Sequence, residues 1–307
     1  MINFVIEIYI LESSTLYYYQ STYFIDMKSR FLFICSMFVI FTLNLYAQNS
    51  LLFKEDMMYT NVTVSHNGNS RSVPALIDTG CSVCLIDSTY AVDSCNVIVT
   101  GSNATIGNIA DKRIKSFDFN IDSVSIAGIS YPKVRCFVVD LAGKFLHHAP
   151  KFILGGNFLK KEIWCFDLNT RMMKRSDVPK KGSSIRIKWK NHDDYRDVGL
   201  NSIYFKGKIE GKKTRIFFDT GSRRNYLPKT FGIKATREIE KERGDIANKL
   251  KMMKCGLCEG VCMELSQNRY LLDFILTNDQ DPCVNASFLF GKSFILDYSH
   301  KTLHILR

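Results

Sequence analysis

The feature that most constrains this chain is a short apolar run that ends in Asp-Thr-Gly and occurs twice. The motif closes the stretch ALIDTG at Gly80 and the stretch IFFDTG at Gly221. Such a run predicts a buried strand, and a carboxylate at its end is costly unless partners or a function keep it there. Because the same local solution appears twice in one chain, we expect Asp78 and Asp219 to be partners.

A second landmark follows each motif. FILGGNFL places an apolar run before Gly155 and an aromatic residue three positions later, and FLFGKSFI does the same around Gly291. The two glycines lie 155 − 78 = 77 and 291 − 219 = 72 residues after the aspartates. A strand, a polar turn with glycine and another strand also precede each motif, which predicts a β-hairpin. The chain is therefore predicted to contain an internal duplication.

The doubled motif with its landmarks resembles the aspartic proteases of the pepsin and retropepsin clan. The resemblance covers roughly residues 55–307. It implies an all-β, bilobal fold made of two fused retropepsin-like lobes with the active site between them. It also implies an aspartic endopeptidase in which Asp78 and Asp219 share one proton and activate a water, with no metal or other cofactor.

The turn residues beside the aspartates are expected to support the site. Glycine allows a tight turn with close backbone approach, and threonine hydroxyls can add hydrogen bonds that lock two turns together. By resemblance the threonines bridge the lobes, and the later glycine motif packs beneath each turn. The predicted support residues are Thr79, Gly80, Thr220, Gly221 and Ser222.

The positions after the motifs depart from the family pattern. Cys81 stands where the family has a small Ser, Thr or Ala, and Arg223 and Arg224 stand where retroviral relatives are often acidic. Two interpretations of the arginines remain open: they point into the cleft and favour acidic peptide side chains, or they face solvent. Cys81 and Cys84 likewise allow simple packing or a disulfide that ties site geometry to redox state.

A flap is expected to cover the substrate. The stretch 96–114 has apolar runs around a polar segment with Gly101 and Gly107, which are counted with Cys81 and the two arginines as candidates for substrate contact. In the second half, the apolar residues of TREIEKERGDIANKLKMMK recur at near-helical spacing. This stretch predicts a helix, so the second half is expected to lack a matching flap.

The N-terminal part predicts export. Lys28 and Arg30 precede an apolar stretch that runs to Thr42 and is followed by Ala47, the layout of a secretory signal peptide. An uncleaved membrane anchor is the alternative. The predicted organisation is a mis-assigned extension (1–26), a signal peptide (27–47), a first lobe (48–175), a basic exposed linker (176–195) and a second lobe (196–307).

Ten cysteines fit an exported protein and leave its thiol chemistry open. CGLCEGVC, with a later cysteine, is compatible with two disulfides or a four-thiolate zinc site, and export favours disulfides. The four residues are Cys255, Cys258, Cys262 and Cys283. The adjacent His147 and His148 are interpreted as solvated residues of a polar loop rather than metal ligands.

The net charge of +11 suggests attraction to anionic membrane surfaces. Nucleic-acid binding is not expected, because no aromatic platform or reader motif accompanies the basic residues. The predicted partner is a peptide or protein substrate, bound by a monomer that holds both lobes in one chain. Two other hypotheses are retained: a catalytically silent peptide-binding module of the same fold, and a cysteine-metal or redox protein.

Overall fold

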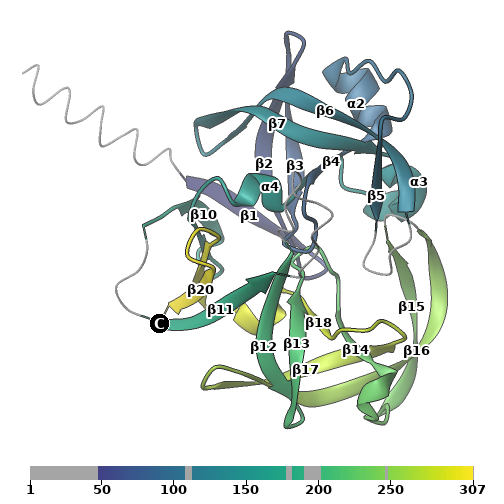
Figure 1. Cartoon of the computed structure of the whole chain (residues 1–307), viewed down its shortest axis with the longest axis vertical. Helices are drawn as coiled ribbons and strands as arrows, with labels where there is room; N and C mark the ends of the chain where they lie inside the picture. The colour runs from purple at the N-terminus through teal and green to yellow at the C-terminus, as the bar shows by residue number, and fades with distance from the viewer. Residues whose placement is uncertain (1–47, 108–112, 178–181, 190–201, 246–247, 307) are drawn as a thin grey trace, which may run out of the picture. The chain divides into compact units, whose positions relative to one another are not determined.

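The computed structural model describes residues 48–107, 113–177, 182–189, 202–245 and 248–306, and this part of the chain consists mainly of β-strands (Figure 1). The helical segments are short: α2 (Ser88–Cys95), α3 (Leu141–Phe145), α4 (Gly156–Leu159) and the 3-10 turns η1 (Leu146–His148), η3 (Lys229–Phe231) and η4 (Ala286–Leu289). The predicted all-β class is confirmed. None of the helices in the described ranges has the length and apolar character needed to span a bilayer.

One sheet carries the first Asp-Thr-Gly motif. Its strands are β1 (Gln48–Lys54), β2 (Met57–His66), β3 (Asn69–Ile77), β4 (Cys84–Asp87), β6 (Arg113–Ile126), β7 (Ile129–Val139) and β8 (Phe152–Leu154). β2 and β3 form the predicted hairpin, β3 runs parallel to β8, and β4 runs parallel to β7. The short strand β5 (Ala104–Gly107) pairs with the start of β6. Asp78 therefore follows directly on the buried end, Ala75 to Ile77, of a strand that is paired on both sides.

A second sheet carries the second motif and repeats this pairing. Its strands are β12 (Ile203–Ile209), β13 (Lys212–Phe218), β14 (Asn225–Pro228), β15 (Arg237–Asp245), β16 (Asn248–Leu265), β17 (Asn268–Thr277) and β18 (Cys283–Val284). β12 and β13 form a hairpin, β13 runs parallel to β18, and β14 runs parallel to β17. The duplication seen in the sequence thus extends to strand order and direction.

A third sheet joins strands from both halves of the chain. It adds β9 (Trp164–Asp167), β10 (Met172–Arg175), β19 (Ser293–Asp297), β20 (Thr302–Leu306) and β11 (Ser183–Trp189). Its order is β1, β10, β9, β19, β20, β11. At its centre the buried rings of Phe166 and Phe294 stack with centroids 4.8 Å apart.

The basic segment expected to be an exposed linker contains part of this sheet. β11 pairs with both β20 and β12, and its Ile185 and Ile187 are 2% and 1% exposed. The alternation of these isoleucines with charged residues is typical of a strand with one buried face. The positive charge of this segment therefore belongs partly to the solvent face of a strand.

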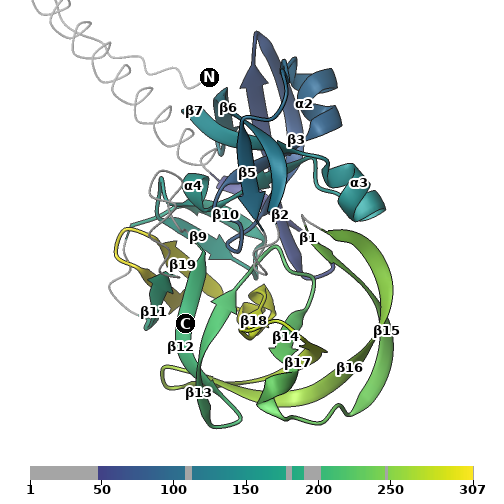
Figure 2. The same ribbon diagram turned by 45° about the vertical axis from the view of Figure 1, so that its right-hand side comes forward.

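The predicted helix in the second half is wrong. The stretch forms β15 and the start of β16, which pair antiparallel with a bulge near Arg243 (Figure 2). Of its described apolar residues, Met252 and Met253 are 61% and 47% exposed and Ile239 and Leu250 are half-buried, so none of them is in the core. β16 continues into the core, where Val261, Met263 and Leu265 are buried and the strand pairs with β17. This long-range pairing outweighs the local spacing.

Candidate active site

The two aspartates occupy equivalent places at the ends of β3 and β13. The backbone N–H of Asp78 donates to the carbonyl of Leu154 at 3.1 Å, and the N–H of Asp219 donates to the carbonyl of Val284 at 2.9 Å. Each aspartate is therefore anchored by the parallel neighbour of its own strand, β8 or β18. The expectation that the two motifs form equivalent turns is met in these contacts.

The two threonines exchange hydrogen bonds across the site. The N–H of Thr79 donates to Oγ1 of Thr220, and the N–H of Thr220 donates to Oγ1 of Thr79, both at 3.1 Å. Each hydroxyl then donates to a carbonyl before the other motif, Thr79 to Phe218 at 2.8 Å and Thr220 to Ile77 at 2.6 Å. Both threonines are almost fully buried. The four bonds hold the two turns together.

The glycines of the motifs bring each turn against the other aspartate. A Cβ atom on Gly80 would lie 2.5 Å from Cγ of Asp219, and a Cβ atom on Gly221 would lie 2.5 Å from Cγ of Asp78. Any larger residue at either position would displace a carboxyl group. Glycine is required here by close approach rather than by backbone conformation.

Backbone N–H groups hold both carboxyl groups. Oδ1 of Asp78 accepts from the N–H groups of Gly80 at 2.9 Å and Cys81 at 2.8 Å. Oδ1 of Asp219 accepts from Gly221 at 2.9 Å, and a backbone hydrogen bond from Ser222 also acts on this carboxyl. Burial raises the pKa of Asp78, but its two N–H donors and a hydrogen bond from Asp219 counteract it.

The neighbouring charge acts differently on the second carboxyl group. Burial and then the negative charge of Asp78 raise the pKa of Asp219 well above its ordinary value. Because the two buried carboxyls interact directly, they share one proton and titrate as a pair. The pair offers one base and one acid side by side.

The second landmark is confirmed after the first motif only. Gly155 packs against the chain that follows that motif, since a Cβ atom there would lie 2.1 Å from the carbonyl oxygen of Val83. Gly291 is wrong as its counterpart: its φ is +75° and a Cβ atom would meet nothing within 4 Å. Gly291 instead allows a local turn with positive φ.

The true counterpart of Gly155 is Asn285. It follows β18 as Gly155 follows β8, with φ −91° and ψ −168° against φ −87° and ψ −179°. Its Nδ2 donates to the carbonyl of Ser222 at 3.2 Å, and its N–H donates to Oδ1 of Asn225 at 2.9 Å. The sequence around Asn285 has the same pattern as that around Gly155, namely a short apolar run before it and an aromatic residue, Phe288, three positions after it. This pattern would have identified Asn285 if asparagine had been allowed in place of glycine.

The thiol of Cys81 lies beside the first aspartate. Its Sγ donates to the carbonyl of Val83 at 3.0 Å, and burial raises its pKa well above the ordinary value, so the thiol is neutral. All nine cysteines in the described ranges are free, so neither the disulfides favoured for Cys255, Cys258, Cys262 and Cys283 nor the alternative bridge between Cys81 and Cys84 is formed. The four cysteines considered for zinc also form no metal-binding group among the described residues.

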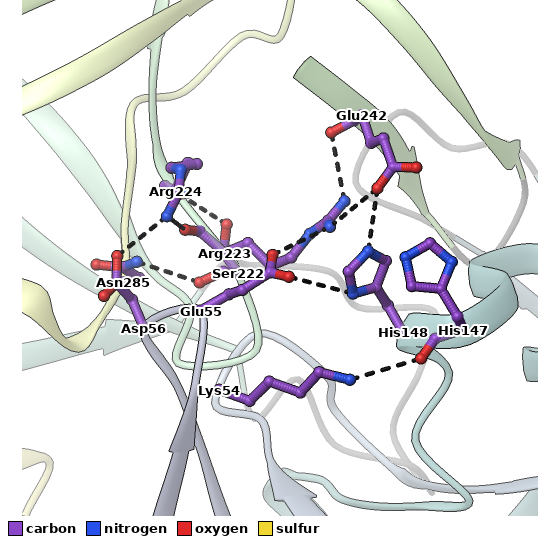
Figure 3. A network of polar contacts seen from close by, with 10 residues as sticks. All are labelled: Lys54, Glu55, Asp56, His147, His148, Ser222, Arg223, Arg224, Glu242 and Asn285. Carbon is purple, nitrogen blue, oxygen red and sulfur yellow. Dashed lines mark hydrogen bonds and ion pairs between the residues drawn. The ribbon is translucent and has the colours of Figure 1, made fainter.

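The two arginines after the second motif pair with carboxylates of the chain itself, and their contact with substrate stays a prediction. Nη1 of Arg223 lies 3.2 Å from Oε2 of Glu55 and 3.5 Å from Oε2 of Glu242, and its side chain is 18% exposed (Figure 3). Nη1 of Arg224 lies 3.2 Å from Oδ2 of Asp56. Both guanidinium groups are thus paired with the turn between β1 and β2, and Arg223 also reaches β15.

The expected flap is a hairpin in the described residues. β5 and β6 pair antiparallel, with Ala104 opposite Ser116 and Gly107 opposite Arg113. Residues 108–112 between them lie outside the described ranges. Ile106 and Ile114 pack with Cys81 against a buried cluster that includes Tyr59. Gly107 ends β5, and Gly101 has φ +131° in the exposed segment before it. Whether these glycines contact substrate stays a prediction.

Sequence reasoning missed Tyr59 on β2. Burial, followed by the charges of Glu55 and Asp78, raises the pKa of Tyr59 to about 12. Its phenol therefore stays protonated near the aspartate pair and is a hydrogen-bond donor. Tyr59 lies 19 positions before the first aspartate and belongs to no sequence motif. Only the strand register, in which Tyr59 pairs with Leu76, reveals that it lies close to Asp78.

A comparison with protein families matches residues 62–158 to a model described as aspartyl protease. The matched range includes the first Asp-Thr-Gly, the β5–β6 hairpin and Gly155. Comparison with curated proteins finds no match. The family match supports a protease-type function, a peptidase hydrolase, for a chain that contains this domain.

Proposed function

We propose that the chain is an aspartic endopeptidase whose catalytic pair is Asp78 and Asp219. The observation that carries the proposal is the reciprocal exchange of hydrogen bonds between Thr79 and Thr220, which holds two identical motifs face to face. The family match supports the same reaction class independently, although it covers only the first motif.

The unequal surroundings of the two carboxyls suggest their roles. Asp78 is the general base that takes a proton from a water between the carboxyls, and Asp219 is the acid that polarises the scissile carbonyl. The attacking oxygen forms a bond to the carbonyl carbon, and the tetrahedral intermediate then breaks at the C–N bond as the nitrogen receives a proton. Thr79, Gly80, Thr220, Gly221 and Ser222 keep the pair in place.

The matched pairing of the two sheets supports a bilobal arrangement of two retropepsin-like lobes. A peptide would bind between them as an extended strand, its backbone groups paired as in other cases of strand addition. The β5–β6 hairpin would cover the bound peptide from the first half of the chain. The β15–β16 hairpin would cover it from the second half, which was expected from the sequence to lack a flap. Because both halves belong to one chain, a monomer suffices.

Export through residues 27–47 and association with an anionic membrane surface remain part of the proposal. They rest on the signal-like sequence and on the net charge of +11. Nucleic acid is not proposed as a partner. N-terminal sequencing of the chain isolated from its natural source tests export, since cleavage after Ala47 is expected and an intact N-terminus contradicts it.

The catalytic proposal is tested by cleavage of an unfolded protein from acidic to neutral pH. We expect the wild type to cut, and Asp78→Asn and Asp219→Asn to be inactive while they retain the wild-type circular dichroism spectrum. Asp93→Asn, which changes an exposed carboxylate on α2, is the matched control and should cut normally. If the folded wild type does not cut but binds the unfolded chain, the silent peptide-binding module is the better account.

A further inference from the structure

Side chains with metal-binding chemistry gather next to the second Asp-Thr-Gly turn. His147 and His148 come from η1 and Glu242 comes from β15 (Figure 3). One nitrogen of each imidazole and one carboxylate oxygen lie within 4.8 Å of one another. We propose that these three residues bind a divalent transition metal ion of the zinc class, in a site separate from the aspartate pair.

The donor set suits such an ion. Two imidazoles and one carboxylate are a common ligand set for zinc and similar metals, and three protein ligands leave a fourth position for water. Nε2 of His148 already lies 3.0 Å from Oε2 of Glu242. Tetrahedral ligands with bonds of about 2.0 Å lie about 3.3 Å apart. Only the exposed His147 needs to move closer, by rotation of its side chain.

The ring of His148 has a carboxylate close to its far nitrogen. Its Nδ1 lies 3.3 Å from Oε1 of Glu55 without a formed hydrogen bond, and the side chain is only 11% exposed. A small shift of Glu55 would complete this bond, and a carboxylate on the far nitrogen selects the tautomer that leaves Nε2 free for the metal and raises the basicity of the ring. Arg223 pairs with Glu55 at 3.2 Å. The supporting carboxylate is therefore in place before any ion binds.

Nearby charges are compatible with an added cation. The guanidinium of Arg223 and the ammonium of Lys54, which donates to the carbonyl of His147 at 3.5 Å, are opposed by the carboxylates of Glu55 and Glu242. When Oε2 of Glu242 binds the metal, Arg223 keeps Glu55 and the backbone carbonyl of Glu242, to which its Nη2 donates at 3.3 Å. The ion replaces one hydrogen bond and leaves the arginine in place.

The ion would fasten β15 to η1, two segments that are 94 residues apart in the sequence. The β15–β16 hairpin would then be held against the first half of the chain. This differs from the expectation that the two histidines are merely solvated, because His148 proves to be largely buried between two carboxylates. The inference does not rest on the proposed protease activity.

The test is titration of the metal-free full chain with cobalt, followed by calorimetry and visible absorption. We expect one ion per chain. His147→Ala and Glu242→Gln should each weaken binding at least about tenfold, and Glu55→Gln should weaken it about tenfold through the ring of His148. The control His66→Ala, which removes an imidazole paired with Asp122 on another strand, should leave the affinity unchanged.

Three results would overturn the inference. They are the lack of binding to the wild type, equal affinity in His147→Ala, and a thiolate-to-cobalt absorption band, which would place the ion on cysteines. Zinc should also raise the unfolding temperature of the wild type and not that of His147→Ala. Because His147 is exposed, this variant is expected to fold, which unfolding without metal will verify.

Discussion

At the scale of single residues, the site depends on hydroxyl groups that are buried with their partners. Oγ1 of Thr220 accepts from the N–H of Thr79 and donates to the carbonyl of Ile77, so its removal leaves two buried polar groups unpaired. The identity of these threonines was predictable because the motif repeats. Their reciprocal pairing depends on how the two turns meet, and only the structure shows it.

Thr220→Val should therefore destabilise the protein by about 2 to 6 kcal/mol, since each of the two unpaired buried groups costs about 1 to 3 kcal/mol. Thr214→Val makes the same change at a half-buried position on β13, where the hydroxyl bonds only the neighbouring carbonyl of Arg215, and should cost under about 0.5 kcal/mol. Denaturant unfolding measures both. Equal losses would show that the exchange of hydrogen bonds does not hold the turns.

The raised pKa of Asp219 predicts how stability changes with pH. A carboxyl whose pKa is higher in the folded than in the unfolded chain binds more protons when folded, so stability falls as pH rises from about 4 toward the folded pKa. The variant Asp219→Asn lacks this titrating carboxyl group. Its free energy of unfolding should rise relative to the wild type as the pH increases from about 4 toward the raised pKa of Asp219. A difference that is constant over this range would contradict the assignment, and Asp93→Asn serves as control.

Asn285 shows why one part of the site was not predictable. The sequence offered Gly291 in an apolar context that mimics the first landmark, and asparagine was not considered in a position that the family fills with glycine. The backbone conformation at Asn285 is extended, so a side chain is sterically allowed there. At Gly155 a side chain is not allowed, because the carbonyl of Val83 occupies the place of its Cβ atom.

At the scale of elements, this difference predicts unequal effects of one substitution. Gly155→Ala forces α4 and the chain at Val83 apart and should cost at least about 3 kcal/mol, at the upper end for overpacking. Gly291→Ala meets open space and only the strain of a positive φ, about 1 to 2 kcal/mol. Unfolding in denaturant tests the pair. A larger loss for Gly291→Ala would restore the landmark first inferred from the sequence.

The β15–β16 hairpin is the element that local patterns predicted least well. Near-helical spacing of apolar residues is informative only when those residues are buried, and Met252 and Met253 are exposed. The decisive contacts are with β17 and with Arg223 and His148, which come from remote parts of the sequence. By contrast, the hairpins before each aspartate were predictable from alternation and a glycine turn.

At the scale of the whole described molecule, the third sheet couples the two halves. β9 and β19 pair side by side, and Phe166 stacks on Phe294 in a fully buried position. Glycine motifs and strand patterns do not specify which strands of a duplicated chain share a sheet. The absence of disulfides among the described cysteines also had no signal, because buried free cysteines serve as small apolar residues.

Because of this shared sheet, the two halves should unfold together. Tryptophan fluorescence, to which the buried Trp164 of β9 contributes, and circular dichroism should give coincident transitions in denaturant. Phe294→Ala on β19, the strand paired with β9, should lower the denaturation midpoint for both probes, with a loss of about 3 to 5 kcal/mol in the free energy of unfolding. Two separate transitions in the wild type would show that the halves are independent.

The central claim is that the two aspartates form one coupled pair, and NMR titration of carboxyl carbons in labelled aspartate tests it most directly. Comparison with Asp219→Asn assigns the resonance of Asp219. We predict that Asp219 titrates well above an ordinary aspartate and that its pKa falls in Asp78→Asn, because the neighbouring negative charge is gone. Ordinary titration of Asp219, or a raised pKa that Asp78→Asn leaves unchanged, would contradict the account.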